Sequence, residues 1–243
     1  MEDNKFDHQY SNIIQLEEAG SSRTFISNVF MWMFVALGIS GVFAYLFATN
    51  AELLGMIVNL TTGKLTGFGT VTIFAPLAFV LVMNFGLNRI SYPVLVVLFL
   101  AYASLMGISL SFILLAYTSG SVFGVFVTAA AVFALMAIAG YTTNTDLTKF
   151  GSLMVMGLIG LVIASVVNMF LVSDELSKII SYVGVAVFVG LTAYKVQMLK
   201  RIGTGVEMGQ AEGKKLALMG AMSLYITFIN LFLSLLRIFG RRR

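Results

Sequence analysis

The last apolar stretch of the chain, residues 222–240, carries the side chains whose types and spacing are best suited to chemistry. Five polar residues recur there at steps of four, three, four and three. On a helix this spacing places them along one side, because residues three and four apart are neighbours in space. Facing lipid, each polar group would cost about 1–3 kcal/mol or more, so this side must face protein or trapped water. This polar stripe consists of Ser223, Thr227, Asn230, Ser234 and Arg237.

Two interpretations of the polar stripe stay open. Serine and threonine often lie between helices because small residues let helix backbones approach closely. The same hydroxyls, with the amide of Asn230 and the guanidinium of Arg237, could instead line a cavity. In either case, a helix with a polar side that needs cover must be surrounded by other helices.

Two cations and one acid lie near the polar stripe by topology. Lys195 lies near the end of the sixth apolar run, so it either snorkels to the interface or faces inward. If it faces inward it needs a partner, and Asp146 is the nearest acid. Arg89 lies at the same level, either as an ordinary positive-inside anchor or beside Lys195 in one cavity. Two cations in one cavity would favour an anion, water or Asp146 between them.

The composition is that of an integral membrane protein. The 243 residues are 59% hydrophobic and 11% charged, with a mean hydropathy of +0.96. A soluble domain carries about a quarter charged residues. The net charge is +4, but the basic residues lie at the ends of apolar runs, which is typical of a topology signal rather than of a nucleic-acid surface. We therefore expect the lipid bilayer as a partner and no nucleic acid.

Seven apolar runs predict an all-α integral membrane fold, a bundle of seven transmembrane helices. Most runs are close to the roughly 20 residues needed to cross a hydrocarbon core. Residues 1–24 form a polar N-terminal tail without a signal-peptide cleavage site, and residues 25–243 form a single transmembrane domain. The predicted runs are 25–48, 71–86, 94–116, 122–141, 153–172, 179–199 and 216–239.

Basic residues in the short loops predict a cytoplasmic N-terminus. Seven complete crossings then place the terminal arginines, residues 241–243, on the outside, against the same rule. Either the excess of basic residues in the earlier loops decides the orientation, or the last segment does not cross the membrane completely. Its apolar length suffices for a crossing, so we expect it to cross.

Several kinds of chemistry lack their usual residues in this chain. There is no cysteine, and the one histidine, His8, lies in the polar tail, so thiolate and multi-histidine metal sites and Ser–His catalysis are disfavoured. Each of the 11 acids falls in a tail, a loop or a span end. Proton relays, intramembrane aspartyl proteolysis and carboxylate cages for hard cations are therefore disfavoured as well. We expect no enzyme activity, no catalytic residue, no metal site and no cofactor.

Four segments together resemble the Bax inhibitor-1 family, especially its bacterial YccA-like branch. They are LYITFINLFLSLLRIFG at 224–240, GYTTNTDLTKFG at 140–151, VVNMFL at 166–171 and FVGLTAYKVQ at 188–197. The resemblance covers nearly the whole chain after residue 24. It implies a seven-helix bundle with the C-terminal helix central and six helices wrapped round it, in a bacterial inner membrane. For function it implies a pH-sensitive calcium leak channel or, as in some bacterial members, a binding partner of a membrane-embedded ATP-dependent protease.

The chain departs from the family at the residues that carry the calcium response. Calcium-leak members have two aspartates that share a proton, on the sixth and seventh helices, and an arginine of the second helix that pairs with the first aspartate. The matching positions here are Lys195, Thr227 and Arg89. Close carboxylates share a proton because like charges disfavour double ionisation, and lysine with threonine cannot do so. We expect a lost or altered response to calcium and pH; the alternative is a non-conducting module that regulates the protease.

Overall fold

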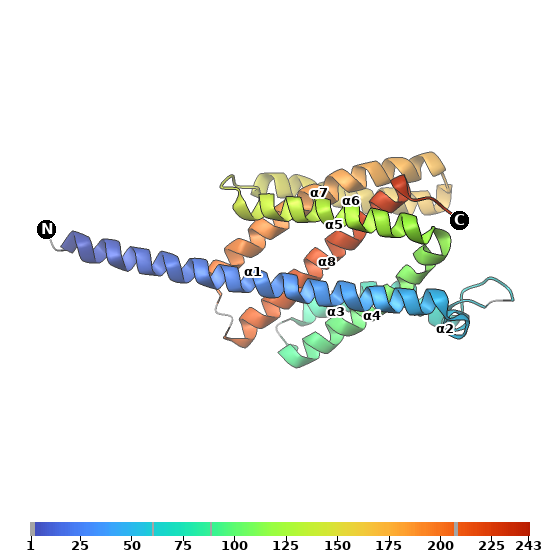
Figure 1. Cartoon of the computed structure of the whole chain (residues 1–243), viewed down its shortest axis with the longest axis horizontal. Coiled ribbons are helices and arrows are strands. Elements are labelled where there is room, and N and C mark those ends of the chain that lie inside the picture. Colours follow the sequence, from blue (N-terminus) through green and yellow to red (C-terminus); the bar gives the residue numbers. More distant parts are fainter. Residues whose placement is uncertain (1–2, 60, 88, 207–208) are drawn as a thin grey trace.

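A computed structural model describes residues 3–59, 61–87, 89–206 and 209–243, with side chains described from residue 20 onward. This part of the chain folds into α-helices joined by short connections (Figure 1). The helices are α1 (Asp3–Thr49), α2 (Ala51–Ile57), α3 (Gly67–Gly86), α4 (Tyr92–Ala116), α5 (Ser119–Thr142), α6 (Thr148–Leu171), α7 (Asp174–Thr204) and α8 (Ala211–Phe239).

The predicted all-helical membrane fold is confirmed. Within the described ranges, seven helices are long and apolar enough to cross a membrane, and each contains one of the predicted apolar runs or overlaps it almost completely. The first of these spans is Gly20–Thr49, the part of α1 that follows the polar tail. The chain ends lie at opposite ends of the molecule (Figure 1), as an odd number of complete crossings requires. The short helix α2, in the connection after the first span, has no counterpart in the predicted runs, and neither does the part of α1 that precedes Gly20.

Helix α8 runs obliquely between two groups of helices, with α1 to α4 on one side and α5 to α7 on the other (Figure 1). It contacts α1, α4, α5 and α7. In its most apolar window 67% of the residues are buried, against 11% in that of α6. However, α3 packs mainly against α4, and α6 mainly against α7. The stricter expectation of six helices wrapped round α8 is therefore not confirmed.

Glycines allow the closest helix contacts. A Cβ atom on Gly140 of α5 would lie 2.2 Å from the carbonyl oxygen of Ala193 on α7. A Cβ atom on Gly107 of α4 would lie 2.5 Å from the carbonyl oxygen of Ser40 on α1. Both distances are far shorter than a van der Waals contact, so the backbones can approach this closely only where no side chain intervenes.

Pro76 lies inside α3 and is compensated from the neighbouring helix. A proline has no N–H to donate to the carbonyl four residues earlier, here that of Thr72. The Ser109 hydroxyl of α4 donates to this carbonyl oxygen at 2.7 Å. Because an unpaired carbonyl is costly in a bilayer, this bond both supports the proline and fixes α3 against α4.

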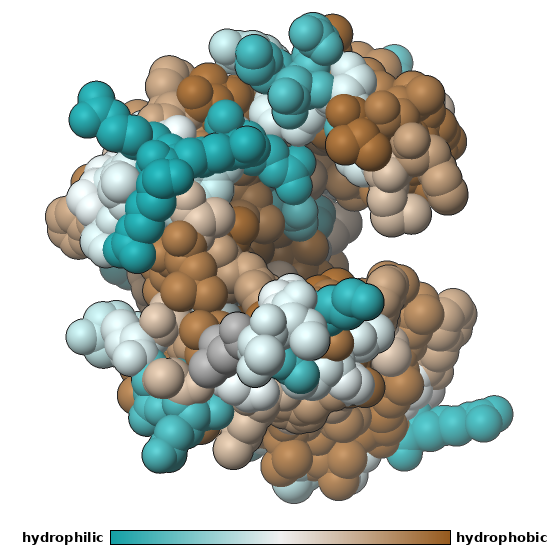
Figure 2. Space-filling view, turned by 90° about the vertical axis from the view of Figure 1, so that its right-hand side faces the viewer, coloured by the Kyte–Doolittle hydropathy of each residue, from teal (hydrophilic) through white to brown (hydrophobic). Residues whose placement is uncertain are grey.

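The arginines after α8 are held on the connection between α4 and α5. Residues 241–243 form two backbone hydrogen bonds of 3.0 Å with residues 116–118. Figure 2 looks onto this end of the molecule, where hydrophilic residues project from a mainly hydrophobic body. The last segment therefore runs the length of the bundle with its arginines anchored at the end opposite the start of α1.

Candidate functional site

The centre of the candidate site is a hydrogen bond between α7 and α8. The Lys195 ammonium donates to Thr227 Oγ1 at 2.8 Å and to the carbonyl oxygen of Ser223 at 3.3 Å. The Thr227 hydroxyl in turn donates to the same carbonyl at 2.8 Å. Thr227 is 1% exposed and Lys195 is half-buried. Of the two orientations open for Lys195, the structure therefore has the inward one, with the lysine turned onto the polar stripe.

The helical period explains why Lys195 reaches two groups of α8 at once. Ser223 and Thr227 are four residues apart, so the carbonyl of one and the hydroxyl of the other lie at the same level of the helix. An ammonium group that faces inward in a membrane protein needs such acceptors, because an unsolvated charge is costly there. The Lys195 amine is thus held by neutral oxygens, and within the part of the chain that the structure describes no carboxylate is bonded to it.

A cavity of about 240 Å³ lies beside this bond, between α3, α7 and α8. Asn84, Lys195 and Ser223 are the polar residues in its lining, and the other lining residues are apolar or glycine. The Asn84 amide donates to the Val80 carbonyl of its own helix at 2.8 Å. The polar walls therefore offer a cation, an amide and a backbone carbonyl, which suit water, a neutral solute or an anion better than a metal cation.

Asp146 is not the partner of Lys195, which corrects the counter-ion prediction. Its carboxylate accepts hydrogen bonds from Arg201 Nη2 at 2.7 Å and from Thr148, through N–H at 2.9 Å and Oγ1 at 2.6 Å. These bonds hold the pKa of Asp146 below its usual value, and the two bonds from Thr148 contribute more to this than the bond from Arg201. Asp146 bonds to Arg201 and not to Lys195 because the two cations lie at different depths along α7. Arg201 follows Lys195 by six residues, about 9 Å along α7, and so reaches the exposed connection where Asp146 lies.

The buried side chain of Gln197 connects the same loop to α7, a role that was not predicted from the sequence. Its Oε1 accepts from the N–H of Leu147 at 2.8 Å, and its Nε2 donates to the carbonyl oxygen of Thr145 at 2.8 Å. Both amide ends are therefore used to hold the connection between α5 and α6. The one available signal was a glutamine amid the apolar residues of the sixth run.

Arg89 lies apart from the Lys195–Thr227 bond. It belongs to the connection between α3 and α4, and its side chain is exposed. Its backbone N–H donates to the carbonyl of Gly86 at 2.8 Å. Arg89 does not belong to the lining of the cavity that contains Lys195. Of the two alternatives for Arg89, the structure therefore does not have the one in which both cations share this cavity.

The polar stripe is divided between the two interpretations. Thr227 and Ser234 are buried, and a Cβ atom on Gly184 of α7 would lie 2.8 Å from the Ser234 hydroxyl. Ser234 thus marks a close helix contact. Ser223 lines the cavity beside Lys195. Asn230 is half-buried and donates to the Ile226 carbonyl at 2.8 Å, whereas Arg237 is exposed in the last turn.

A second polar contact joins three helices and was missed from the sequence. Ser40 Oγ of α1 lies 2.7 Å from Tyr225 Oη of α8 and 2.7 Å from the carbonyl oxygen of Ala103 on α4. Because the carbonyl can only accept, the serine donates to it and the tyrosine donates to the serine. The Tyr225 ring also stacks edge-on against Tyr102, with centroids 5.7 Å apart. A single serine in an apolar run gives no sign of this role.

Known proteins resemble this chain over nearly all of its length. Residues 22–243 match the family model described as Inhibitor of apoptosis-promoting Bax1. Inner membrane protein YbhL of Escherichia coli (strain K12) is 40% identical over 222 residues, covering 91% of this chain and 93% of that protein. An uncharacterized protein of Rickettsia prowazekii is 41% identical over 224 residues, 91% of each chain. An uncharacterized membrane protein of Streptococcus pyogenes serotype M3 is 37% identical over 219 residues, 89% of this chain and 92% of that protein.

Proposed function

This chain belongs to the Bax inhibitor-1 family, and from that premise we propose that it forms the family's membrane pathway without the family's response to calcium and protons. It is a multi-pass bacterial inner membrane protein. In the proposal, the site between α7 and α8 excludes divalent cations and does not titrate as a carboxylate pair. No enzymatic reaction is part of this function.

The observation that carries the proposal is the 2.8 Å bond between Lys195 Nζ and Thr227 Oγ1. These residues occupy the two positions at which the calcium-leak members of the family are expected to have aspartates. A cation about 4 Å from the ammonium would be repelled by about 4 kcal/mol per unit of its charge at an effective dielectric constant of 20. For a divalent ion this repulsion outweighs what neutral hydroxyl and carbonyl oxygens can return.

The cavity beside Lys195 supports the same conclusion about charge. It contains a lysine, an asparagine and a serine as its polar lining. A solute that enters it meets a positive potential, so a neutral molecule or a small anion is favoured over a metal ion. The ion selectivity of the pathway is thus proposed to be reversed relative to the calcium-leak members.

Calcium flux in liposomes tests this function. The purified protein is reconstituted into vesicles that contain a calcium reporter, and the leak is measured at about pH 6 and pH 8, where a coupled carboxylate pair would change its protonation. We expect a leak equal to that of empty vesicles at both values. An acid-stimulated calcium leak of the wild-type protein would overturn the proposal.

A second candidate is a non-conducting module that binds a membrane-embedded ATP-dependent protease. The observation in its favour is α1, whose backbone continues as helix through residues 3–19 before the span begins. This adds about 25 Å of helix, and Figure 1 shows it projecting beyond the other helices. Capture of the protease by the full chain, lost on deletion of residues 1–24 and retained in Lys195→Met, would favour this candidate over a conducting pathway.

A further inference from the structure

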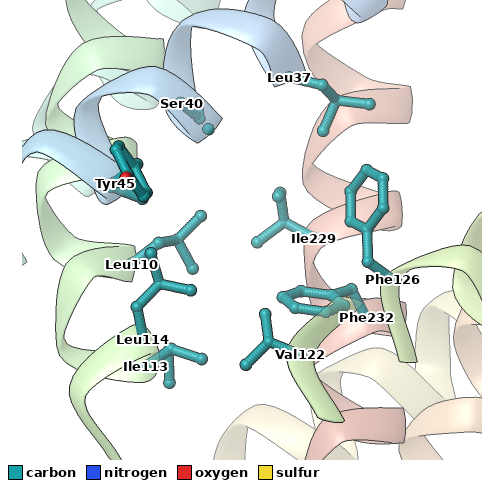
Figure 3. A pocket seen from close by; sticks show the side chains of 12 residues that line it. Leu37, Ser40, Tyr45, Leu110, Ile113, Leu114, Val122, Phe126, Ile229 and Phe232 are labelled. Carbon is teal, nitrogen blue, oxygen red and sulfur yellow. The ribbon is translucent and has the colours of Figure 1, made fainter. Parts of the chain in front are cut away.

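A groove follows the outer half of α1, toward the end of the molecule where the C-terminus lies. Its inner part is a cavity of about 280 Å³ lined by α1, α4, α5 and α8, and its outer part is a cavity of about 420 Å³. Tyr45, Leu114, Val122 and Phe126 line both parts, so the two cavities adjoin each other along α1. Figure 3 shows these side chains around the inner part, with Ile229 and Phe232 of α8 across the cavity from Tyr45.

The groove opens toward lipid rather than toward the interior of the protein. Tyr45 is 64% exposed and Phe126 is 39% exposed, although both line the cavity. In contrast, Ile229 and Phe232 are buried beneath it. Since these helices span the membrane, the medium outside Tyr45 and Phe126 is the bilayer. An apolar space of this kind is filled by hydrocarbon, because water would find almost no hydrogen-bond partner there.

The length of the groove matches one leaflet. It follows α1 from Leu37 to Thr49, which is about 18 Å at the helical rise. One leaflet contributes about half of a hydrocarbon core that is about 30 Å thick. A single extended acyl chain therefore fits along the groove with its polar end at the level of Thr49.

The outer end of the groove is cationic and polar. Arg243, Ser119 and Thr49 belong to its lining, and Arg243 Nη2 donates to Ser119 Oγ at 3.4 Å. Arg243 is placed there by its backbone N–H, which donates to the carbonyl of Ala116 at 3.0 Å. Among the described residues that line the two cavities there is no acidic side chain. This end is therefore complementary to a negative headgroup, and a guanidinium binds phosphate oxygens in a bidentate manner.

We propose that this groove binds one anionic phospholipid, with an acyl chain between α1, α4 and α5 and the phosphate at Arg243 and Ser119. The bound lipid covers the apolar wall of α8 between the two helix groups and ties the C-terminal tail to the bilayer surface. This proposal does not rest on the Lys195–Thr227 site, so either one can fail without the other.

Native mass spectrometry of the full-length protein tests the proposal. The protein is purified in detergent and mixed with equal amounts of phosphatidylglycerol and phosphatidylcholine, which differ in the net charge of the headgroup. We expect one phosphatidylglycerol molecule per chain to be retained in preference to phosphatidylcholine. Equal retention of the two lipids would overturn the proposal.

Two variants with matched controls test separately the part of the groove that binds the acyl chain and the part that binds the headgroup. Gly41 lines the inner cavity, and a Cβ atom there would meet nothing within 4 Å, so the side chain of Gly41→Phe can begin without a clash, occupies the groove and should abolish lipid retention. Gly38 has equally open surroundings on α1 but lies outside the lining, and Gly38→Phe should retain the lipid.

Arg243→Gln should weaken phosphatidylglycerol binding about fivefold, as expected for an exposed ion pair. Its matched control, Arg241→Gln, should weaken this binding by a smaller factor. Unchanged binding in both Gly41→Phe and Arg243→Gln would contradict the site.

Discussion

At the residue scale, Thr227 is the side chain that holds Lys195 on α8. Its hydroxyl accepts from the ammonium and donates to the Ser223 carbonyl, so one side chain satisfies two groups. The sequence could identify positions 195 and 227, because the resemblance aligned them with a coupled pair. It could not predict their bond, because the rotation of α7 relative to α8 decides whether a lysine near a helix end snorkels or turns inward.

Replacing Thr227 tests this bond. Thr227→Val keeps the shape of the side chain but removes the acceptor, so the half-buried ammonium keeps only its longer bond to the Ser223 carbonyl. We expect the free energy of unfolding in detergent to fall by about 1 kcal/mol, as for interhelical hydrogen bonds in membranes. Thr227→Ser should be close to wild type, and in a Lys195→Met background the effect of Thr227→Val should largely disappear. An undiminished effect in that background would mean that the bond does not carry the stability.

Asp146 illustrates the limit of sequence reasoning about charge pairs. Lys195 and Arg201 lie on the same helix, and the chain order alone does not say which of them lies level with the loop. In the structure, Asp146 forms its ion pair with Arg201. Because its folded pKa is lowered, any stabilisation from this carboxylate is complete above its unfolded pKa of about 4 and is lost only as pH falls below that value. Asp146 therefore stays charged at neutral pH and supplies no switch there.

At the scale of the elements, the seven spans could be predicted because each is a long apolar run bounded by polar residues or glycine. Helix α2 could not, since seven residues are too few to show a helical period. The contacts that fix one helix against another, such as Ser109 with the Thr72 carbonyl and Ser40 with Tyr225, depend on the register between helices. That register is set by packing over the whole bundle, which local spacing does not contain.

The proline in α3 allows a sharp test of one such contact. Ser109→Ala leaves the Thr72 carbonyl without its donor, and we expect a loss of about 1 kcal/mol in the free energy of unfolding. Pro76→Ala restores the backbone N–H that α3 lacks, so in that background Ser109→Ala should cost much less. Unfolding of the four proteins of this cycle in detergent gives the coupling. Purely additive effects would show that the serine does not compensate for the proline.

At the scale of the whole molecule, the opposite placement of the two chain ends resolves the conflict between the loop charges and the terminal arginines. The arginines are bonded to the connection between α4 and α5, at the end of the bundle opposite the start of α1 (Figure 1). If the N-terminus is cytoplasmic, as the loop charges predict, we expect the C-terminus to lie outside.

Reporter fusions measure this topology. Alkaline phosphatase fused after Arg243 should be active, because that enzyme matures only outside the cytoplasm, and a cytoplasmically folding fluorescent protein fused there should stay dark. The same fluorescent protein fused before Met1 should fluoresce. Fluorescence from both ends would contradict complete crossing by α8.

Placing carboxylates at positions 195 and 227 tests whether the residues now there remove the calcium response. If the Lys195–Thr227 bond is what removes the calcium response, then Lys195→Asp combined with Thr227→Asp should create a pair that shares a proton and titrates closer to neutral pH. In reporter vesicles, the double variant should leak calcium at a rate that differs between about pH 6 and pH 8, whereas Lys195→Asn combined with Thr227→Asn, which adds no charge, should not. We expect no calcium leak from the wild-type protein and a pH-dependent leak from the aspartate variant. A wild-type protein that leaks calcium as fast as the aspartate variant, with the same dependence on pH, would contradict it.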